Sequence, residues 1–537
     1  MDLKHVIPQQ RRRTYGPSFD IAFSTDKSNV SRVGPTPVFS RASSGTFVNE
    51  NGLIVGKTRS TTSLNPASVP VGGVAVFAVP SGSVVGWLNN SVVSVMEDTD
   101  GDDQIGAQRH VTGTLIHKTD TAITLLVTSK SGTTTLSSWF VSYRGLRIGH
   151  DPVTGLCFGS LIEESRTNTC RQSENFGTTW TDDVGLVAIS VDQTTSPSGA
   201  MDADKISENT TTSNRRIAVQ AQTFVSGTTY TFSCFVKSAE RDFVQLRFGP
   251  TFGGQFQNFI VGGVNAGTIG SGTGATSAIQ AYPNGWYRCS ITATSATTGS
   301  STITIGPQVS STATAWQPYV GTIGSGIFVW GAQNEAGPAA TSYIPTTAAS
   351  TIRSADVYSV TGTDFSRFFN QTEGTLVCKA TNLSGIVSTG LLGTLSITAA
   401  DRSLCAINLS RTGSSNLRSE VVQGPSFAAA AIFNFTTTAG AEGNTAIAFK
   451  QDDFASSNNG SSVQTDTSGL FPSSPLNQML IGTNGAQRMF GWISNIRYYP
   501  KRLPNSSVQT LSAIVTDTIV YNGVAVWYNG VGLIETN

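Results

Sequence analysis

Apolar and polar residues alternate along much of the chain, and this pattern predicts β-strands. In the stretch TTYTFSCFVKS every second residue over 230–236 is apolar, and GWYRCSITAT repeats the alternation over 287–293. A period of two with one polar face is typical of a half-buried antiparallel strand. Helical patterns are nearly absent; the best is LPNSSVQTLSAI, where Pro504 and Asn505 are start signals. We therefore expect an all-β chain built from tandem antiparallel β-sandwiches.

Turn signals and composition divide the chain into five parts. Asn-Gly dipeptides, which supply the positive φ that tight hairpins need, recur at 51–52, 284–285, 459–460, 484–485, 522–523 and 529–530. The expected parts are an N-terminal arm with first strands (1–57), a small β domain rich in Val, Gly and Thr (58–146), a large sandwich (147–355), a second sandwich (356–512) and an extended aromatic tail (513–537).

Charge and cysteine usage exclude several classes of protein. Only 13% of the 537 residues are charged, and Lys+Arg equals Asp+Glu at 34 each, which argues against a nucleic-acid partner. The polar, Arg-rich start predicts no signal peptide, and no apolar run is long enough to predict membrane insertion. The cysteines show no metal or CxxC spacing, so we expect free thiols made in a reducing cytoplasm; they are Cys157, Cys170, Cys234, Cys289, Cys378 and Cys405.

The stretch GSLIEESRTNTC places Glu163 and Glu164 side by side, close to Arg166. Adjacent residues of a strand point to opposite faces, so the two carboxylates cannot both face one substrate if this stretch is extended. A glycosidase needs its two carboxylates about 5–9.5 Å apart across one sugar bond. We therefore expect a structural role, in which one of the pair meets Arg166 or caps turn amides.

The densest acidic stretch, EDTDGDDQIG, offers oxygen ligands for calcium. The candidates are Asp98, Asp100 and Asp102, although the stretch departs from an EF-hand loop at its Gly and Glu positions. A hydrated hairpin tip is the alternative. No other cofactor is indicated, and no nucleophile, zinc-protease or phosphate-loop motif occurs, so we expect no catalysis.

Aromatic residues in polar stretches are the candidates for ligand binding, because sugars pack flat C–H faces on such rings. Trp316 and Tyr319 lie in ATAWQPYVG, and Trp180 lies in a similar polar stretch. Trp286 and Trp330 fall within strands, where packing is the expected role. The tail TIVYNGVAVWYNGVGLIETN can either dock on a neighbouring subunit or close its own domain as a strand pair.

Five longer stretches stand out, namely RASSGTFVNENGLIV, HDPVTG, LIEESRTN, QSENFGTTW and TSYIPTT. With these stretches the chain resembles modular bacteriophage virion proteins that carry a carbohydrate-binding-module-like jelly roll. The second sandwich resembles a concanavalin/laminin-G-like lectin domain, at AIAFKQDDFASSNNG and GWISNIRYYPKRLPNSSVQTL. In such proteins the RASS segment runs soon into HDPVTG, so residues 58–146 look like an inserted domain.

The resemblance implies a tail-fibre or baseplate-associated adhesin on the virion, made in the host cytoplasm. It would bind a host cell-surface glycan without catalysis and contact other virion proteins through residues 1–57. Fibres of this kind are commonly trimers, so a homo-oligomer is expected, although no coiled-coil heptads occur. The alternatives are a structural capsid or tail decoration protein and a polysaccharide depolymerase.

Overall fold

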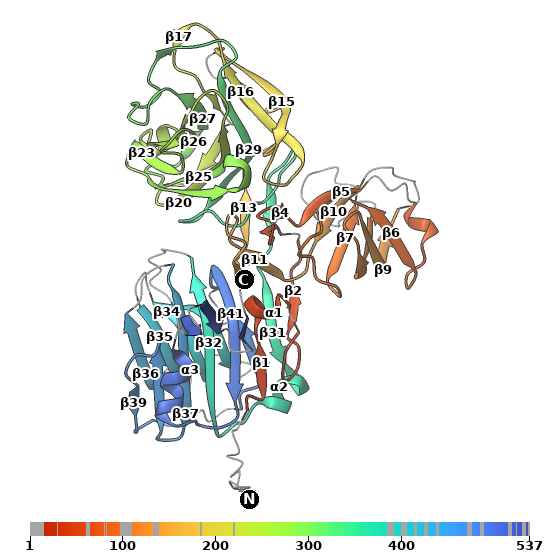
Figure 1. Ribbon diagram of the computed structural model, residues 1–537, viewed down its shortest axis with the longest axis vertical. Helices are drawn as coiled ribbons and strands as arrows, with labels where there is room; N and C mark the ends of the chain where they lie inside the picture. The colour runs from red at the N-terminus through yellow and green to blue at the C-terminus, as the bar shows by residue number, and fades with distance from the viewer. Residues whose placement is uncertain are drawn as a thin grey trace, which may run out of the picture.

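Three β-lobes make up the described part of the chain (Figure 1). The all-β prediction is confirmed, because strands dominate and pair in antiparallel sheets. Among the described residues, no helix has the length and apolar character needed to cross a membrane. The computed structural model describes residues 16–28, 30–43, 45–60, 65–79, 81, 83–96, 110–132, 139–182, 185–218, 221–383, 391–398, 405–412, 416–423, 428–436, 440–469, 475–483, 488–513, 518–521, 524–528 and 533–534.

The inserted lobe is a six-stranded sheet, coloured orange to brown in Figure 1. One face packs on a core that includes Phe77, Trp87 and Tyr143. Phe47 and Val55, which precede the lobe, belong to the same core and fix it to the rest of the chain. The strand order is β5 (Lys57–Ser60), β10 (Trp139–Tyr143), β7 (Val92–Met96), β8 (His110–Lys118), β9 (Ala122–Ser131) and β6 (Val74–Ala78).

The middle lobe is a sandwich of two six-stranded sheets, drawn in yellow and green. The first sheet has the order β14 (Thr181–Asp182), β18 (Ile217–Ala218), β27 (Ile303–Gln308), β21 (Phe243–Phe248), β22 (Phe256–Ile260) and β23 (Thr268–Thr273). The second has the order β15 (Val187–Thr195), β16 (Met201–Glu208), β29 (Gly326–Ala336), β20 (Thr229–Ser238), β25 (Trp286–Thr294) and β24 (Thr276–Tyr282). Two short pairs flank them, β17 (Thr212–Ser213) with β28 (Tyr319–Val320) and β19 (Gln222–Phe224) with β26 (Gly299–Ser301).

The C-terminal lobe is a larger sandwich, blue in Figure 1 with red N-terminal strands added. One sheet has the order β11 (Arg147–His150), β12 (Cys157–Ile162), β41 (Gly491–Tyr499), β32 (Glu373–Asn382), β37 (Glu442–Lys450), β38 (Phe454–Asn458) and β39 (Gln464–Asp466), with β1 (Phe19–Ile21) also on β41. The other has the order β2 (Val38–Ser40), β31 (Val357–Thr361), β40 (Gln478–Ile481), β33 (Leu391–Thr398), β34 (Cys405–Thr412), β35 (Asn416–Gln423) and β36 (Ala428–Thr436). Its helices are α1 (Phe23–Asp26), α2 (Gly362–Phe368) and α3 (Asn505–Ser512).

Two expected boundaries differ from the structure. The parts 1–57 and 147–355 were separated from the second sandwich, but β1, β2, β11 and β12 all belong to that sandwich. The reason is the core: Phe19, Ile148 and Ile162 pack in one apolar cluster with Leu376 and Ile493. Alternation along a strand predicts which face is buried, but it does not name the strand that lies beside it.

Short pairs connect the lobes. The hairpin of β3 (Phe47–Val48) and β4 (Ile54–Val55) lies where the three lobes meet, and Ile54 packs against the outer face of the middle lobe. The pair of β13 (Arg166–Asn168) and β30 (Thr351–Arg353) carries the chain into and out of the middle lobe. The tail strands β42 (Thr518–Tyr521), β43 (Val524–Tyr528) and β44 (Leu533–Ile534) pair with one another.

Several local predictions are confirmed. Asn284 and Gly285 have φ of 60° and 77°, and Asn459 and Gly460 have φ of 50° and 74°, as tight turns require. The one helix read from the sequence forms at Asn505–Ser512 with Pro504 at its cap. The five cysteines whose side chains are described are free, at positions 157, 170, 234, 289 and 378.

A buried ion network joins the lobes. The Glu163 carboxylate lies 2.5 Å from Arg147 Nη1 and 2.9 Å from Arg353 Nη1. The Asp356 carboxylate lies 2.9 Å from Arg41 and 2.5 Å from Arg147. The Glu163 amide donates to Asp356 Oδ2, and the Asp356 amide donates back to the Glu163 carbonyl. Every one of these side chains is almost fully buried, so each charge depends on its partners for compensation.

The same network reaches into each lobe. Arg41 donates to the carbonyl of Tyr143 in the inserted lobe, at 3.2 Å. Glu163 accepts from the amide and hydroxyl of Ser342, which follows the last long strand of the middle lobe. Burial raises the pKa of Glu163, but Arg353, Arg147 and the Ser342 hydrogen bonds outweigh it and lower the pKa to about 2. The carboxylate is therefore ionised at neutral pH.

Glu163→Gln is expected to lower the free energy of unfolding by about 3–5 kcal/mol, because Arg147 and Arg353 would lose their shared counter-charge. Glu164→Gln is the matched control: its side chain is 36% exposed and pairs with Arg166, so a loss below about 1 kcal/mol is expected. Urea unfolding of both variants at pH 7 checks this. Equal losses would contradict a special role for Glu163.

Stability should also depend on pH through this carboxyl. The folded pKa of about 2 lies below the ordinary value of 4.5, so the contribution of Glu163 is present above about pH 4.5 and is lost as pH falls toward 2. Urea midpoints measured between pH 5 and pH 2 should fall for the wild type. The Gln variant should show a shallower fall; parallel curves would refute the assignment.

Candidate functional site

A cleft of about 480 Å³ lies between the middle and C-terminal lobes, and the β3–β4 hairpin contributes to its lining. The C-terminal lobe contributes residues of β11, β12, β32 and β41, and the middle lobe contributes residues of β24, β25 and the segment 340–343. Its aromatic lining residues are Phe47, Phe158, Phe235, Tyr282, Tyr343, Phe490 and Trp492. The cleft is large enough for a sugar-sized ligand.

Trp492 is the aromatic side chain that β41 brings to this cleft while remaining partly exposed. Its ring lies directly over Gly149 of β11: a Cβ added there would be 2.0 Å from ring atom Cζ3. The Phe158 ring lies beside it, with centroids 5.3 Å apart. Glycine at 149 therefore leaves the space that the tryptophan ring occupies.

A β-bulge places Phe158 against Trp492. Between β11 and β12 the register shifts, so that Gly149 lies opposite Gly159 while His150 lies opposite Cys157. Phe158 is the extra residue, and a bulge re-aims a side chain in this way. Gly159 has φ of +106°, and an added Cβ would be 2.3 Å from the Ile493 carbonyl oxygen. A side chain at 159 would therefore push β12 away from β41.

Polar groups follow Trp492 across the sheet. Thr381 lies directly opposite Trp492 in the neighbouring strand, and Glu442 lies opposite Thr381 in the next. Directly opposite residues share one face, so the three line the cleft in a row. Glu442 pairs with Lys379 at 2.6 Å, with both side chains about one third exposed. This wall thus offers a ring face, a hydroxyl and a carboxylate.

The middle lobe contributes a second row on the other wall. Gln280 lies directly opposite Arg288, and Arg288 lies opposite Phe235. The Arg288 guanidinium sits 5.3 Å from the centroid of the Phe235 ring. It donates to the Thr341 carbonyl at 2.8 Å and to the Ser233 hydroxyl at 3.1 Å, which hold it in place.

His150 lies in the floor of the cleft. It is buried, its Nδ1 lies 3.4 Å from the Val48 carbonyl, and its Nε2 has no hydrogen-bond partner. Burial lowers its pKa, so the ring is neutral at pH 7. It therefore adds polarity to the floor but no charge.

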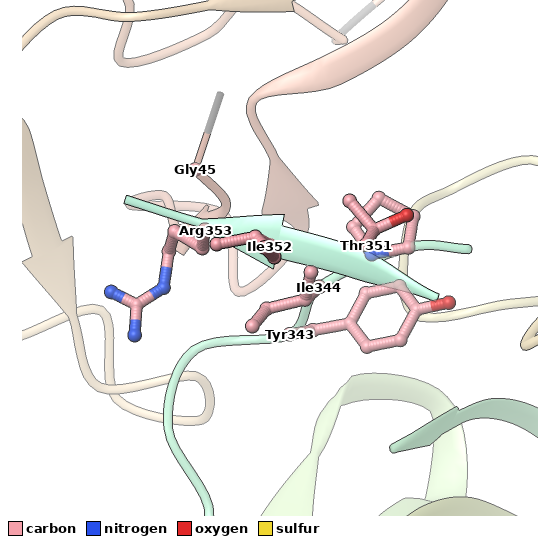
Figure 2. Close-up of a pocket in the computed structure, with 7 residues that line it drawn as sticks. Gly45, Tyr343, Ile344, Thr351, Ile352 and Arg353 are labelled. Carbon is pink, nitrogen blue, oxygen red and sulfur yellow. The ribbon is translucent and has the colours of Figure 1, made fainter. Parts of the chain in front are cut away.

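A second cavity of about 10 Å³ lies beside the ion network. Figure 2 shows β30 running past Tyr343 and Ile344, with Arg353 at one end of the strand and Thr351 at the other. This volume has room for about one water molecule, so it cannot hold a sugar.

The aromatic residues that the sequence analysis chose as ligand-binding candidates do not line the cleft. Trp180, Trp316 and Tyr319 are 4%, 5% and 8% exposed. Trp180 packs on Phe176 with ring centroids 4.8 Å apart, and Tyr319 donates to Glu208 at 2.6 Å. Their burial leaves no free ring face for a sugar, which corrects the expectation that polar neighbours mean an exposed loop. Trp286 and Trp330 are buried in the middle lobe, as expected.

The other candidates from the sequence have different outcomes. Asp98, Asp100 and Asp102 lie outside the described residues. Within the described part of the chain, no group of three or more His, Cys, Asp or Glu side chains is placed to hold a metal. Glu163 and Glu164 have the structural role that was expected: Glu163 accepts a backbone amide, and Glu164 pairs with Arg166.

Sequence reasoning missed Trp492, Gly149 and Arg288. Trp492 lies in GWISNIRYYPKRL, a stretch whose apolar residues read as an ordinary strand. Its partner Gly149 lies more than three hundred residues away in the chain, so no local signal joins them. The one available clue was the HDPVTG stretch, which immediately follows that glycine.

Comparison with known proteins finds partial likenesses. No family model matches the chain, and no curated protein matches its sequence. Among solved structures, the CBM40 of Ruminococcus gnavus IT-sialidase bound to α2,3-sialyllactose matches at 16% identity, covering 28% of this chain and 88% of that one, with a TM-score of 0.25. Domain 4 of the arabinanase AbnA from Geobacillus stearothermophilus, in complex with arabinotriose, matches at 13% identity, covering 29% and 73%, with a TM-score of 0.23.

The NanB sialidase of Streptococcus pneumoniae also matches, at 13% identity, covering 30% of this chain and 27% of that one, with a TM-score of 0.23. These matched proteins are carbohydrate-binding modules or enzymes that act on sugars. The identities and TM-scores of these matches are too low to assign a ligand to this chain. The evidence for a binding site is therefore the geometry of the cleft itself.

Gly149→Ala should cost about 1–3 kcal/mol of stability, because the new methyl group overlaps the Trp492 ring. In a Trp492→Ala background the same change should cost less than about 1 kcal/mol, since the ring is gone. Urea unfolding of the four proteins in this double-mutant cycle checks the contact. Gly16→Ala, whose added Cβ meets nothing within 4 Å, is the control. An equal cost in both backgrounds would disprove the contact.

Proposed function

We propose that this protein binds a glycan in the cleft between its middle and C-terminal lobes. The observation that carries the proposal is Trp492, a partly exposed ring fixed by Gly149 and Phe158. Sugar C–H faces pack on such rings, and neighbouring hydroxyl and carboxylate groups fix the sugar's orientation. Thr381 and Glu442 supply those groups in the same row.

We further propose binding without hydrolysis. A glycosidase needs a carboxylic acid that donates a proton near neutral pH, and therefore a raised pKa. The carboxylates that line the described cleft are Glu163 and Glu442. The pKa of Glu163 is about 2, and both of its oxygens already accept hydrogen bonds. Glu442 is paired with Lys379. Neither environment favours a proton donor.

The setting that we propose is the surface of a bacteriophage particle, where the protein acts as a tail-fibre or baseplate-associated adhesin. The sequence resemblance supports this proposal. Several copies on one particle would combine weak sugar contacts into firm attachment to a host cell. Since β1 and β2 are built into the C-terminal lobe, attachment through residues 1–57 would involve that lobe as well.

A structural decoration protein is the second candidate, and one observation favours it. Val92, Thr114, Leu126 and Val74 lie directly opposite one another across four strands of the inserted lobe. The three apolar members are 39–54% exposed. An exposed apolar row of this kind suits contact with a neighbouring protein.

Trp492→Ala should reduce retention of the purified protein on host cells at least tenfold, because the ring face is the main apolar contact for a sugar. Retention on candidate host cells and release of reducing ends from extracted surface polysaccharide are measured together. Val264→Ala, which removes a fully exposed apolar side chain outside the cleft, is the control and should change neither.

The outcomes separate the candidates. Retention that depends on Trp492, without reducing-end release, supports the adhesin. Reducing-end release by the wild type would identify a depolymerase and overturn binding without hydrolysis. If the wild type shows no retention on cells and releases no reducing ends, the result favours the decoration protein.

A further inference from the structure

Arg288 carries a positive charge that no carboxylate of the described residues neutralises at close range. Its hydrogen-bond acceptors are neutral, the Thr341 carbonyl and the Ser233 hydroxyl. Its Nε is buried without a hydrogen-bond partner. Glu335 interacts electrostatically with Arg288 but lies beyond ion-pair distance. Its carboxylate already accepts hydrogen bonds from Thr341 and Gln333.

The ion network beneath the cleft adds positive charge. Arg41, Arg147 and Arg353 pair with the carboxylates of Glu163 and Asp356. Arg353 also interacts electrostatically with the buried Glu335. An excess of cations below a partly enclosed cleft raises the local concentration of anions. On the opposite wall, the carboxylate of Glu442 is offset by Lys379, so it does not cancel this excess.

Gln280 stands beside Arg288 and extends its donor set. The two residues are directly opposite on neighbouring strands, and Gln280 is exposed. A guanidinium next to an amide NH₂ presents converging donors, which is the arrangement that binds a carboxylate. The Phe235 ring packs against the guanidinium, and Arg288 donates two hydrogen bonds to protein groups. These contacts fix the orientation of Arg288 before a ligand binds.

We propose that the cleft selects acidic glycans, whose sugar carboxylate pairs with Arg288 and Gln280. This inference rests on the proposed glycan-binding function and names its ligand class. The carboxylate belongs to a uronic or sialic acid residue of the chain. Trp492, on the opposite wall, packs against the apolar face of a sugar. The two walls thus bind different chemical groups of one ligand.

The test uses native protein with hyaluronan, alginate and polysialic acid, each beside its carboxyl-reduced form, and with neutral dextran. At least one acidic polymer should bind, and its carboxyl reduction should weaken the affinity at least tenfold, because a charge-assisted hydrogen-bonded pair is lost. Raising NaCl from 50 to 500 mM should lower the affinity for the acidic polymer more than the affinity for its reduced form.

Two variants locate the effect. Arg288→Gln should reduce affinity for the acidic polymer to that of its reduced form. Gln280→Ala removes only an exposed amide and should weaken acidic binding about threefold. Thermal unfolding shows whether the Arg288→Gln variant is folded. If it is not folded, the inference is tested by comparing the affinity of the native protein for the intact and the carboxyl-reduced polymers.

The failures are distinguishable. Equal affinity for an acidic polymer and its reduced form, or binding of dextran alone, would overturn the acidic-glycan inference and leave glycan binding intact. No binding of any polymer in this set would count against both.

Discussion

Glu163 and Asp356 are carboxylates buried where the three lobes meet, and their compensation by Arg41, Arg147 and Arg353 is the constraint on which the architecture depends. A buried charge without its partner is strongly destabilising, so the segments that carry these residues must stay together. Those segments lie far apart in the chain. The network therefore fixes the relative position of the lobes more strictly than apolar packing, which is not directional.

The cleft is a consequence of that arrangement. Arg147 begins β11, and two residues later Gly149 accepts the Trp492 ring. Glu163 directly follows β12, the strand that carries Phe158, and its partner Ser342 lines the same cleft. Arg147 thus lies two positions from Gly149, and Glu163 lies five positions from Phe158, so charged residues that hold the lobes together are close in the chain to residues that shape the site. A change in the network would move both walls.

The N-terminal region shows why local reading misplaced the boundaries. Phe19 and Ile21 alternate with Asp20, as expected of a strand, yet their partner is β41, almost five hundred residues later. The inserted lobe begins after β4 and ends before β11, and Val55 of β4 belongs to its core. Such insertions are tolerated at surface turns because the ends of the insertion lie close together.

The sequence by itself determined the all-β class, the Asn-Gly turns at 284–285 and 459–460, the helix at 505–512 and the structural role of the Glu163–Glu164 pair. The Asn-Gly dipeptides at 484–485, 522–523 and 529–530 lie outside the described residues. Each follows from local rules: alternation, positive φ, capping, and opposite faces of a strand. The tertiary structure decided which aromatic rings are exposed. Trp316 and Tyr319 lie in a polar stretch but are covered, whereas Trp492 lies in an apolar strand but faces the cleft. Exposure depends on which lobe lies opposite, and that is set by long-range packing and paired charges that no local window contains.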